Sequence, residues 1–136
     1  MRDAALTALF SLVLASGCAA QTVADDTAVC SAYQAGRSRV EVVADGTVTR
    51  VFGVAPGVVS PHEGFLMRLS TGCNVIVRVE ANTAFTGSFP IARGDRVTVK
   101  GEYEFYPRGG VIHWTHRDPR NRHEGGFIEI GGKTYD

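Results

Sequence analysis

The sequence lacks an excess of either charge, since 14 lysine and arginine residues balance 14 aspartate and glutamate residues. Proteins that bind nucleic acids generally show a basic excess or a basic stripe, so we expect no general nucleic-acid binding. Internal repeats and low-complexity tracts are also absent from the sequence. The chain is therefore long enough for one small domain, and its sequence gives no indication of a second.

Long apolar runs are equally scarce. The uncharged run at residues 4–15 is too short for a transmembrane helix, which needs about 20 apolar residues. It is typical of the apolar core of a signal peptide, and we assign residues 1–20 to such a leader. Two endings remain open: a lipobox-like segment that would place a lipid on Cys18, or ordinary cleavage after Ala20. We expect an exported protein, either free in the periplasm or anchored as a lipoprotein, with a lipid on Cys18 as its only membrane contact.

Cysteine is rare, with three residues and no Cys-x-x-Cys spacing, which disfavours a cysteine-based metal site. Cys18 belongs to the leader region and leaves Cys30 and Cys73 in the folded part. An even pair in a small exported domain predicts a disulfide between them. Two buried free thiols are the alternative.

One short helix is expected at the start of the folded part. Residues 25–27 supply capping oxygens and negative charge, and Gly36 is a natural end. From Ser38 onward apolar residues recur with period two, which predicts strands. The pair Asp45-Gly46 is typical either of a hairpin or of a bulge in one long, bent strand.

The remaining alternation predicts further short strands separated by turns, with 16 glycines in the whole sequence. The clearest pattern places Val97, Val99, Tyr103 and Phe105 on one buried side. Residues 81–94 are expected to form an irregular connection without a helix. The expected strands cover residues 40–44, 47–54, 65–69, 75–79, 96–105, 111–115, 127–130 and 133–135.

This layout resembles an OB-fold, with the entry GDRVTVKG at residues 94–101 leading into the fourth strand. We therefore predict an all-β fold: a small OB-like Greek-key β-barrel with one short N-terminal helix, spanning residues 21–136. Barrels of this type bind ligands with the loops between strands 1–2 and 4–5. Here those loops contain His62 and Arg108.

The groups best suited to chemistry gather in residues 109–126, GGVIHWTHRDPRNRHEGG. This stretch holds three of the four histidines, the only tryptophan and three arginines. The candidate ligand-binding residues are His113, His116, Asp118, Arg120, Arg122 and His123, with His62 and Arg108 at the rim.

Three chemistries are open to this stretch. His113, His116, His123 and Asp118 could bind Zn or another divalent metal, provided that the strand breaks near Thr115. The arginines could hold a small anionic ligand, and histidine could then act as an acid in a metal-dependent phosphodiesterase or nuclease-like hydrolase. In the structural alternative Trp114 fills the barrel, while the polar side chains fasten a long loop.

The segment GGVIHWTHRDPRNRHEGGFI, with GEYEF at residues 101–105, resembles a family of small exported bacterial proteins with an HWTH motif, domain of unknown function 3465. The resemblance implies no activity, substrate or catalytic residue. From the residues themselves we predict a ligand-binding or interaction module whose partner is a small anionic ligand, a glycan or an envelope protein. The alternatives are the hydrolase and a purely structural envelope protein.

Overall fold

The structure is a computed structural model that describes residues 24–136. The expected leader, the lipid site at Cys18 and the first residues of the expected domain lie outside the described residues. Within residues 24–136, no helix is both long enough and apolar enough to cross a membrane. The described chain is mostly β-structure, with one helix of nine residues and one of four.

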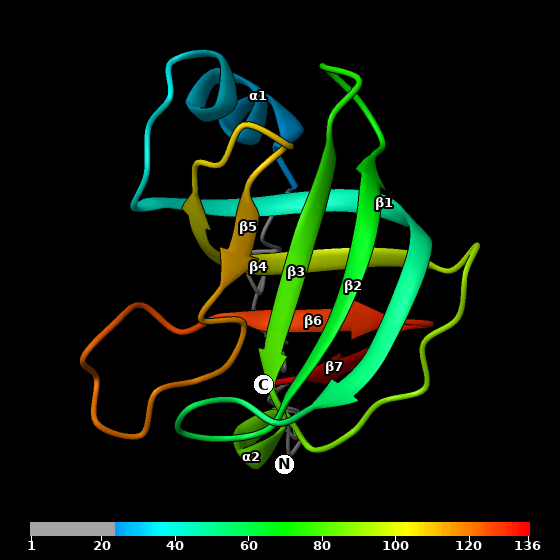
Figure 1. Ribbon diagram of the computed structural model, residues 1–136, viewed down its shortest axis with the longest axis vertical. Coiled ribbons are helices and arrows are strands. Elements are labelled where there is room, and N and C mark those ends of the chain that lie inside the picture. Colours follow the sequence, from blue (N-terminus) through cyan, green and yellow to red (C-terminus); the bar gives the residue numbers. More distant parts are fainter. Residues whose placement is uncertain (1–23) are drawn as a thin grey trace, which may run out of the picture.

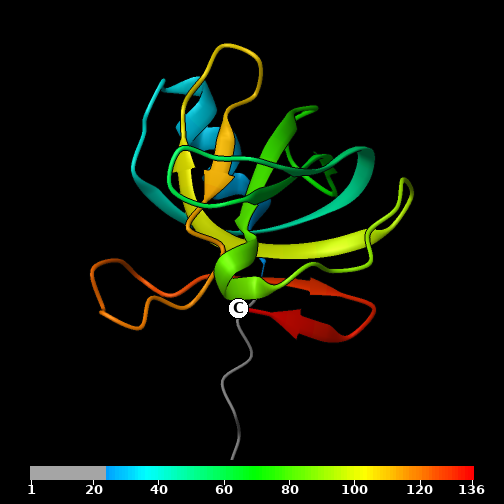
Figure 2. The same ribbon diagram turned by 60° about the horizontal axis from the view of Figure 1, so that its bottom comes forward.

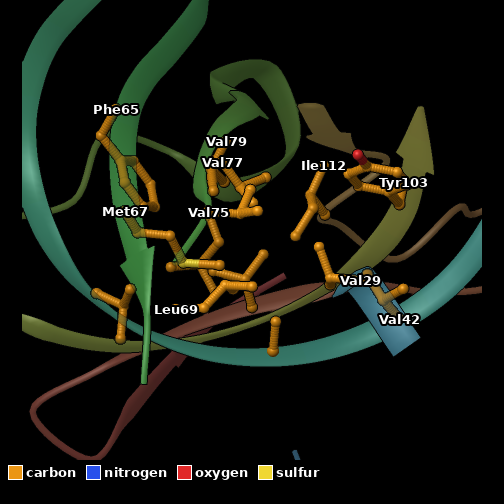
Figure 3. Packing of buried hydrophobic residues seen from close by; sticks show 14 of the residues in the cluster. Val29, Val42, Phe65, Met67, Leu69, Val75, Val77, Val79, Tyr103 and Ile112 are labelled. Carbon is orange, nitrogen blue, oxygen red and sulfur yellow. The ribbon is translucent and has the colours of Figure 1, made fainter. Parts of the chain in front are cut away.

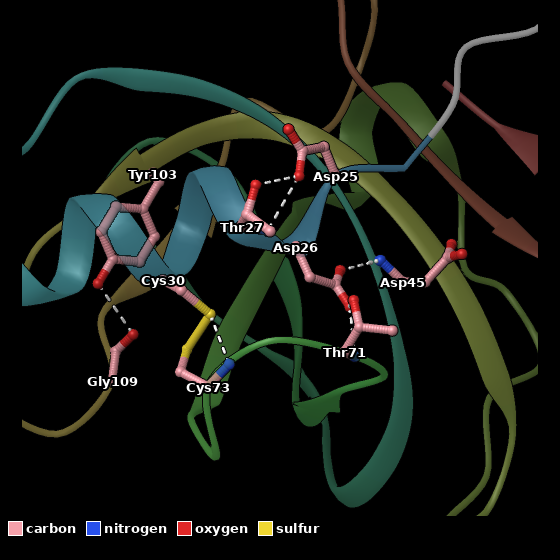
Figure 4. Close-up of a disulfide and its surroundings, with 9 residues drawn as sticks. All are labelled: Asp25, Asp26, Thr27, Cys30, Asp45, Thr71, Cys73, Tyr103 and Gly109. Carbon is pink, nitrogen blue, oxygen red and sulfur yellow. Dashed lines mark hydrogen bonds between the residues drawn. A yellow bond between two sulfur atoms is a disulfide. The ribbon is translucent and has the colours of Figure 1, made fainter.

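The first element is the predicted helix, α1 (Asp26–Gln34). Its N-cap residue Asp25 accepts a hydrogen bond from the backbone N–H of Thr27 at 3.1 Å. The buried carboxylate of Asp26 accepts hydrogen bonds from the backbone N–H groups of Asp45 and Thr71, each at 2.8 Å (Figure 4). Asp25 therefore caps the helix, and Asp26 holds it against two segments that are distant in the sequence.

A disulfide joins Cys30 in α1 to Cys73, as predicted (Figure 4). Cys73 lies in the turn between β2 (His62–Leu69) and β3 (Ile76–Asn82), which pair as an antiparallel hairpin. Linking residues far apart in the sequence restricts the unfolded chain, which stabilises the fold by at most about 4 kcal/mol for a loop of this length. The bond holds the helix against one end of this hairpin.

The long first strand, β1 (Val40–Ala55), pairs with two different partners. Its first half runs antiparallel to β4 (Arg96–Glu104), and its second half runs antiparallel to β2. Gly46 belongs to both registers, and a Cβ there would meet the carbonyl oxygen of Arg68 at 2.7 Å. Of the two alternatives for Asp45-Gly46, the chain therefore adopts the long bent strand, without a hairpin turn at this point.

Five strands form a closed ring of hydrogen-bonded neighbours (Figure 1). The short strand β5 (Val111–His113) closes it by pairing parallel to β3 and antiparallel to β4. The ring order is β1-β2-β3-β5-β4, with β4 returning to β1. The predicted closing hairpin, β6 (Phe127–Ile130) and β7 (Lys133–Tyr135), continues from the edge of β4.

The core lies inside this ring, where β2, β3, β4 and β5 direct alternate side chains inward (Figure 3). Val97, Val99 and Tyr103 are buried as predicted, and Phe105 packs on the cluster from its edge. The hydroxyl of Tyr103 donates a hydrogen bond to the carbonyl of Gly109 at 3.1 Å (Figure 4). Burial raises the pKa of Tyr103 to about 12, with Tyr33 as a second cause, so this phenol stays protonated at neutral pH.

Two local expectations were wrong. The connection after β3 contains a short helix, α2 (Thr83–Thr86), where we expected none. The side chain of Asn82 caps it by accepting a hydrogen bond from the backbone N–H of Ala84 at 3.0 Å, an N-cap that we did not use as a signal. The strand expected at 111–115 ends at His113, because Trp114 adopts a positive φ of 55°.

Candidate functional site

The candidate site begins where β5 ends and the chain turns into the loop of residues 114–126, drawn in orange beside the ring (Figures 1 and 2). Thr115 anchors the start of this loop, because its hydroxyl donates a hydrogen bond to the carbonyl of Glu80 at 3.1 Å. Gly126 anchors the end by donating its N–H to the carbonyl of His116 at 2.9 Å. A Cβ on Gly126 would lie 2.2 Å from the carbonyl oxygen of Trp114, so this close approach needs glycine.

Trp114 lies at the centre of the predicted stretch, and its side chain does not fill the interior of the five-stranded ring. Its side chain is 39% exposed, which contradicts the alternative that placed it in the core. Its ring centroid lies 4.5 Å from that of His123, 5.3 Å from that of His113 and 6.1 Å from that of His116. The structure therefore gathers the three predicted histidines around one partly exposed indole.

His116 is the most deeply buried of these histidines, at 2% exposure. It stacks face to face on Phe85 and meets His123 edge-on, with ring centroids 5.1 Å apart. Neither of its ring nitrogens has a hydrogen-bond partner. Burial lowers the pKa of His116, and the nearby His123 lowers it further, so the ring is held in its neutral form.

The hydrogen bonds of two other histidines define which nitrogen carries the proton. The Nδ1 atom of His123 lies 2.8 Å from the carbonyl oxygen of Glu124, and that of His62 lies 2.8 Å from the carbonyl oxygen of Ser60. A carbonyl only accepts, so each Nδ1 carries the hydrogen and the neutral ring keeps a lone pair on Nε2. The Nε2 atom of His123 is buried without a partner, and it can accept a hydrogen bond or bind a metal.

Asp118 has a different role from the histidines, because its oxygens are already occupied. It accepts hydrogen bonds from the backbone N–H of Arg120 at 3.0 Å and from that of Arg122 at 2.7 Å. The guanidinium of Arg122 donates two more, at 3.0 Å and 3.3 Å. The pKa of Asp118 is held well below its usual range. The hydrogen bond from the Arg122 side chain is the largest cause, and the one from the Arg120 backbone is the second. Asp118 and Arg122 thus fasten the loop.

A groove of about 460 Å³ lies next to the histidines, across one face of the ring. Its wall includes three exposed aromatic side chains, Phe52, Tyr106 and Trp114. The polar side chains that line it are His62, Asn82, Arg78, Glu80, Glu104, His113 and His116.

The charged side chains that line this groove, apart from the histidines, are one arginine and two glutamates. Arg78 forms an ion pair with Glu80, and Glu104 adds a second carboxylate. The predicted rim residue Arg108 lines a neighbouring cavity instead, and Arg120 is exposed on the loop. The groove therefore brings together His62, His113 and His116 from the predicted set and leaves the predicted arginines outside.

Sequence reasoning missed two carboxylates that lie beside His113. Its Nε2 atom is 3.5 Å from an oxygen of Glu102 and 3.9 Å from an oxygen of Glu104. Among the described residues, these three side chains, all of types that can ligate a metal, have donor atoms within 4.8 Å of one another. Of the four predicted metal ligands, only His113 is one of them. The alternation of residues in β4 showed that both glutamates face outward. It could not show which residue of the neighbouring strand lies opposite them.

The family model described as "Protein of unknown function (DUF3465)" matches residues 12–136. The chain belongs to the DUF3465 family. This confirms the resemblance seen in the sequence, and the match includes the whole groove and the loop beside it. No curated protein and no solved structure matches the chain.

Proposed function

We propose that this DUF3465 protein is an exported OB-like Greek-key barrel that binds a glycan in the groove beside Trp114. The observation that carries the proposal is the composition of the groove: three exposed aromatic rings stand next to carboxylates and to imidazoles with unpartnered nitrogens. Sugar rings present apolar C–H faces that stack on aromatic rings, and their hydroxyl groups donate to carboxylates and exchange hydrogen bonds with imidazoles.

The order of the strands supports the OB-like assignment. The ring closes with β3 and β5 parallel, after a long first strand shared between β2 and β4. OB-type barrels bind oligosaccharides and oligonucleotides on the face of strands 2 and 3, between the loops that follow strands 1 and 4. The groove is lined by residues of β2 and β3, by Pro56 and Gly57 after β1, and by Tyr106 after β4.

A glycan fits the groove better than the anionic ligand that the arginine count suggested. The side chain of Arg122 is used by Asp118, and that of Arg117 pairs with Asp136. Arg78, which lines the groove, is paired with Glu80, and Glu104 would repel an anion. Neutral hydroxyl groups meet no such repulsion.

Export is part of the same proposal. The leader expected at residues 1–20 and the disulfide between Cys30 and Cys73 both support an oxidising compartment outside the cytoplasm. The periplasm and a lipid anchor on Cys18 are equally consistent with it. In either place the ligand would be an envelope glycan.

The proposal is tested by isothermal titration of the mature, tag-free protein with N-acetylglucosamine oligomers and, separately, with inorganic phosphate, both in the presence of a chelator. We expect saturable binding of the sugar and none of phosphate. Trp114→Ala and Phe52→Ala should each weaken sugar binding at least about tenfold, because each removes a stacking surface, which corresponds to about 1.4 kcal/mol.

Val54→Ser is the matched control, because Val54 is an exposed apolar residue of β1 that does not line the groove. It should bind the sugar as the parent protein does. Absence of sugar binding in the parent refutes the glycan assignment. Tight binding of phosphate would instead restore the anionic ligand.

A further inference from the structure

Three glutamates and one histidine lie close together on adjacent strands, on the outer side of the ring of strands. Glu41 in β1 lies directly opposite Glu102 in β4, and Glu102 lies directly opposite His113 in β5. Glu104 follows Glu102 by two residues in the same strand and therefore faces the same side of the sheet. The strand register, rather than a flexible loop, sets the positions of these four side chains.

In the part of the chain that the structure describes, these glutamates form no ion pair with a lysine or an arginine. Within residues 24–136, the sole ion-pair contact of Glu102 and Glu104 is with His113. The nearby Lys100 pairs with Glu124 at 2.7 Å instead. The side chains of Glu102, Glu104 and His113 are 24%, 26% and 33% exposed, so water screens them only in part.

Without a bound cation, this arrangement of carboxylates destabilises the sheet. Like charges directly opposite each other on neighbouring strands destabilise a sheet, and Glu41 and Glu102 form such a pair. One oxygen of Glu41 and the Nε2 atom of His113 are buried without hydrogen-bond partners.

We propose that Glu102, Glu104 and His113 form a binding site for a divalent transition-metal cation such as Zn²⁺ or Mn²⁺. Two carboxylates and one imidazole are donors that borderline cations of this class accept, and three protein ligands leave coordination positions open. Glu104 and His113 also line the groove, whereas Glu102 does not. The open positions would face a ligand in the groove, but the site does not depend on the glycan assignment.

The test uses Co²⁺ as a spectroscopic probe on mature, tag-free protein that has been stripped with a chelator and dialysed. Visible absorption should report saturable binding of one Co²⁺ in a low-symmetry site, and Zn²⁺ should displace it. Glu102→Gln and His113→Gln should each lower the Co²⁺ affinity at least about tenfold, because each removes one ligand. Glu129→Gln is the control, since Glu129 is an exposed glutamate of β6 that lies outside the cluster.

Loss of binding through unfolding is excluded by melting curves of the metal-free variants. Glu102→Gln removes the like-charge pair with Glu41, so its metal-free form should melt no lower than the parent. Absence of Co²⁺ binding in the parent overturns the proposal, and so does an unchanged affinity in Glu102→Gln. Loss of binding in His116→Gln but not in Glu102→Gln also overturns it, because the cation would then sit between His116 and His123.

Discussion

Phe85 lies flat against His116, with ring centroids 4.4 Å apart and ring planes within 6° of parallel. Phe85 belongs to α2, so this short helix provides one wall around the buried imidazole. The stacking explains why His116 is shielded from water although it lies at the start of a surface loop.

Removing Phe85 should restore the ordinary titration of His116. The largest cause of its lowered pKa is burial, and Phe85→Ala opens the stacked face of the ring to water. We expect the pKa of His116 to rise toward the value of about 6.5 found in unfolded chains. A pH titration of the imidazole carbon resonances by NMR measures it. Val58→Ser, a change at a fully exposed loop residue, should leave the titration as it is.

The stability of the protein should fall on mild acidification. Because the folded state lowers the pKa of His116, the unfolded chain takes up a proton first as the pH drops below about 6.5, and this favours unfolding. Above that pH the ring is neutral in both states and contributes no slope. Thermal unfolding between pH 7.5 and pH 5.5 should show a steeper loss in the parent than in His116→Gln. If stability fell equally with pH in the parent and in His116→Gln, His116 would not be the cause of the loss.

Asp118→Asn should loosen the loop of residues 114–126. An amide cannot form the ion pair with Arg122, and one of its two polar atoms no longer accepts from the loop backbone. We expect a lower melting temperature and faster hydrogen exchange at the amide of Asn121, which donates to the carbonyl of Asp118.

Asp136→Asn is the matched comparison for this loop variant. It removes the partner of Arg117, an exposed pair at the end of the chain, and exposed pairs contribute little. Its melting temperature should stay near that of the parent. If both variants melted alike, Asp118 would not fasten the loop.

Tyr103→Phe should destabilise the core without changing its shape. The phenol hydroxyl donates to the carbonyl of Gly109, and its removal leaves a buried acceptor unpaired, which costs about 1–3 kcal/mol. Urea unfolding at neutral pH measures the loss. Tyr106→Phe provides the control, because Tyr106 is 59% exposed, and it should change the stability by less than about 0.5 kcal/mol.

Local patterns in the sequence were enough for much of the fold. The alternation of Val97, Val99 and Tyr103 predicted a strand with one buried side, and the structure confirms it. Capping residues predicted α1, and the pair Cys30 and Cys73 predicted the disulfide. Each of these signals depends on residues whose own types reveal the environment that they need. Residue types also singled out the histidine-rich stretch, but the groove beside it was not predicted.

Long-range contacts decided the rest. Alternation shows that Glu102 faces outward, but only the register between β4 and β5 places it opposite His113. The stacking of Phe85 on His116 likewise depends on how the segment after β3 packs against the loop after β5. Arginine content suggested an anion site, and only the fold shows that Arg122 is paired with Asp118. Composition determines which groups are present, whereas strand pairing and packing determine which of them meet and which remain free to bind.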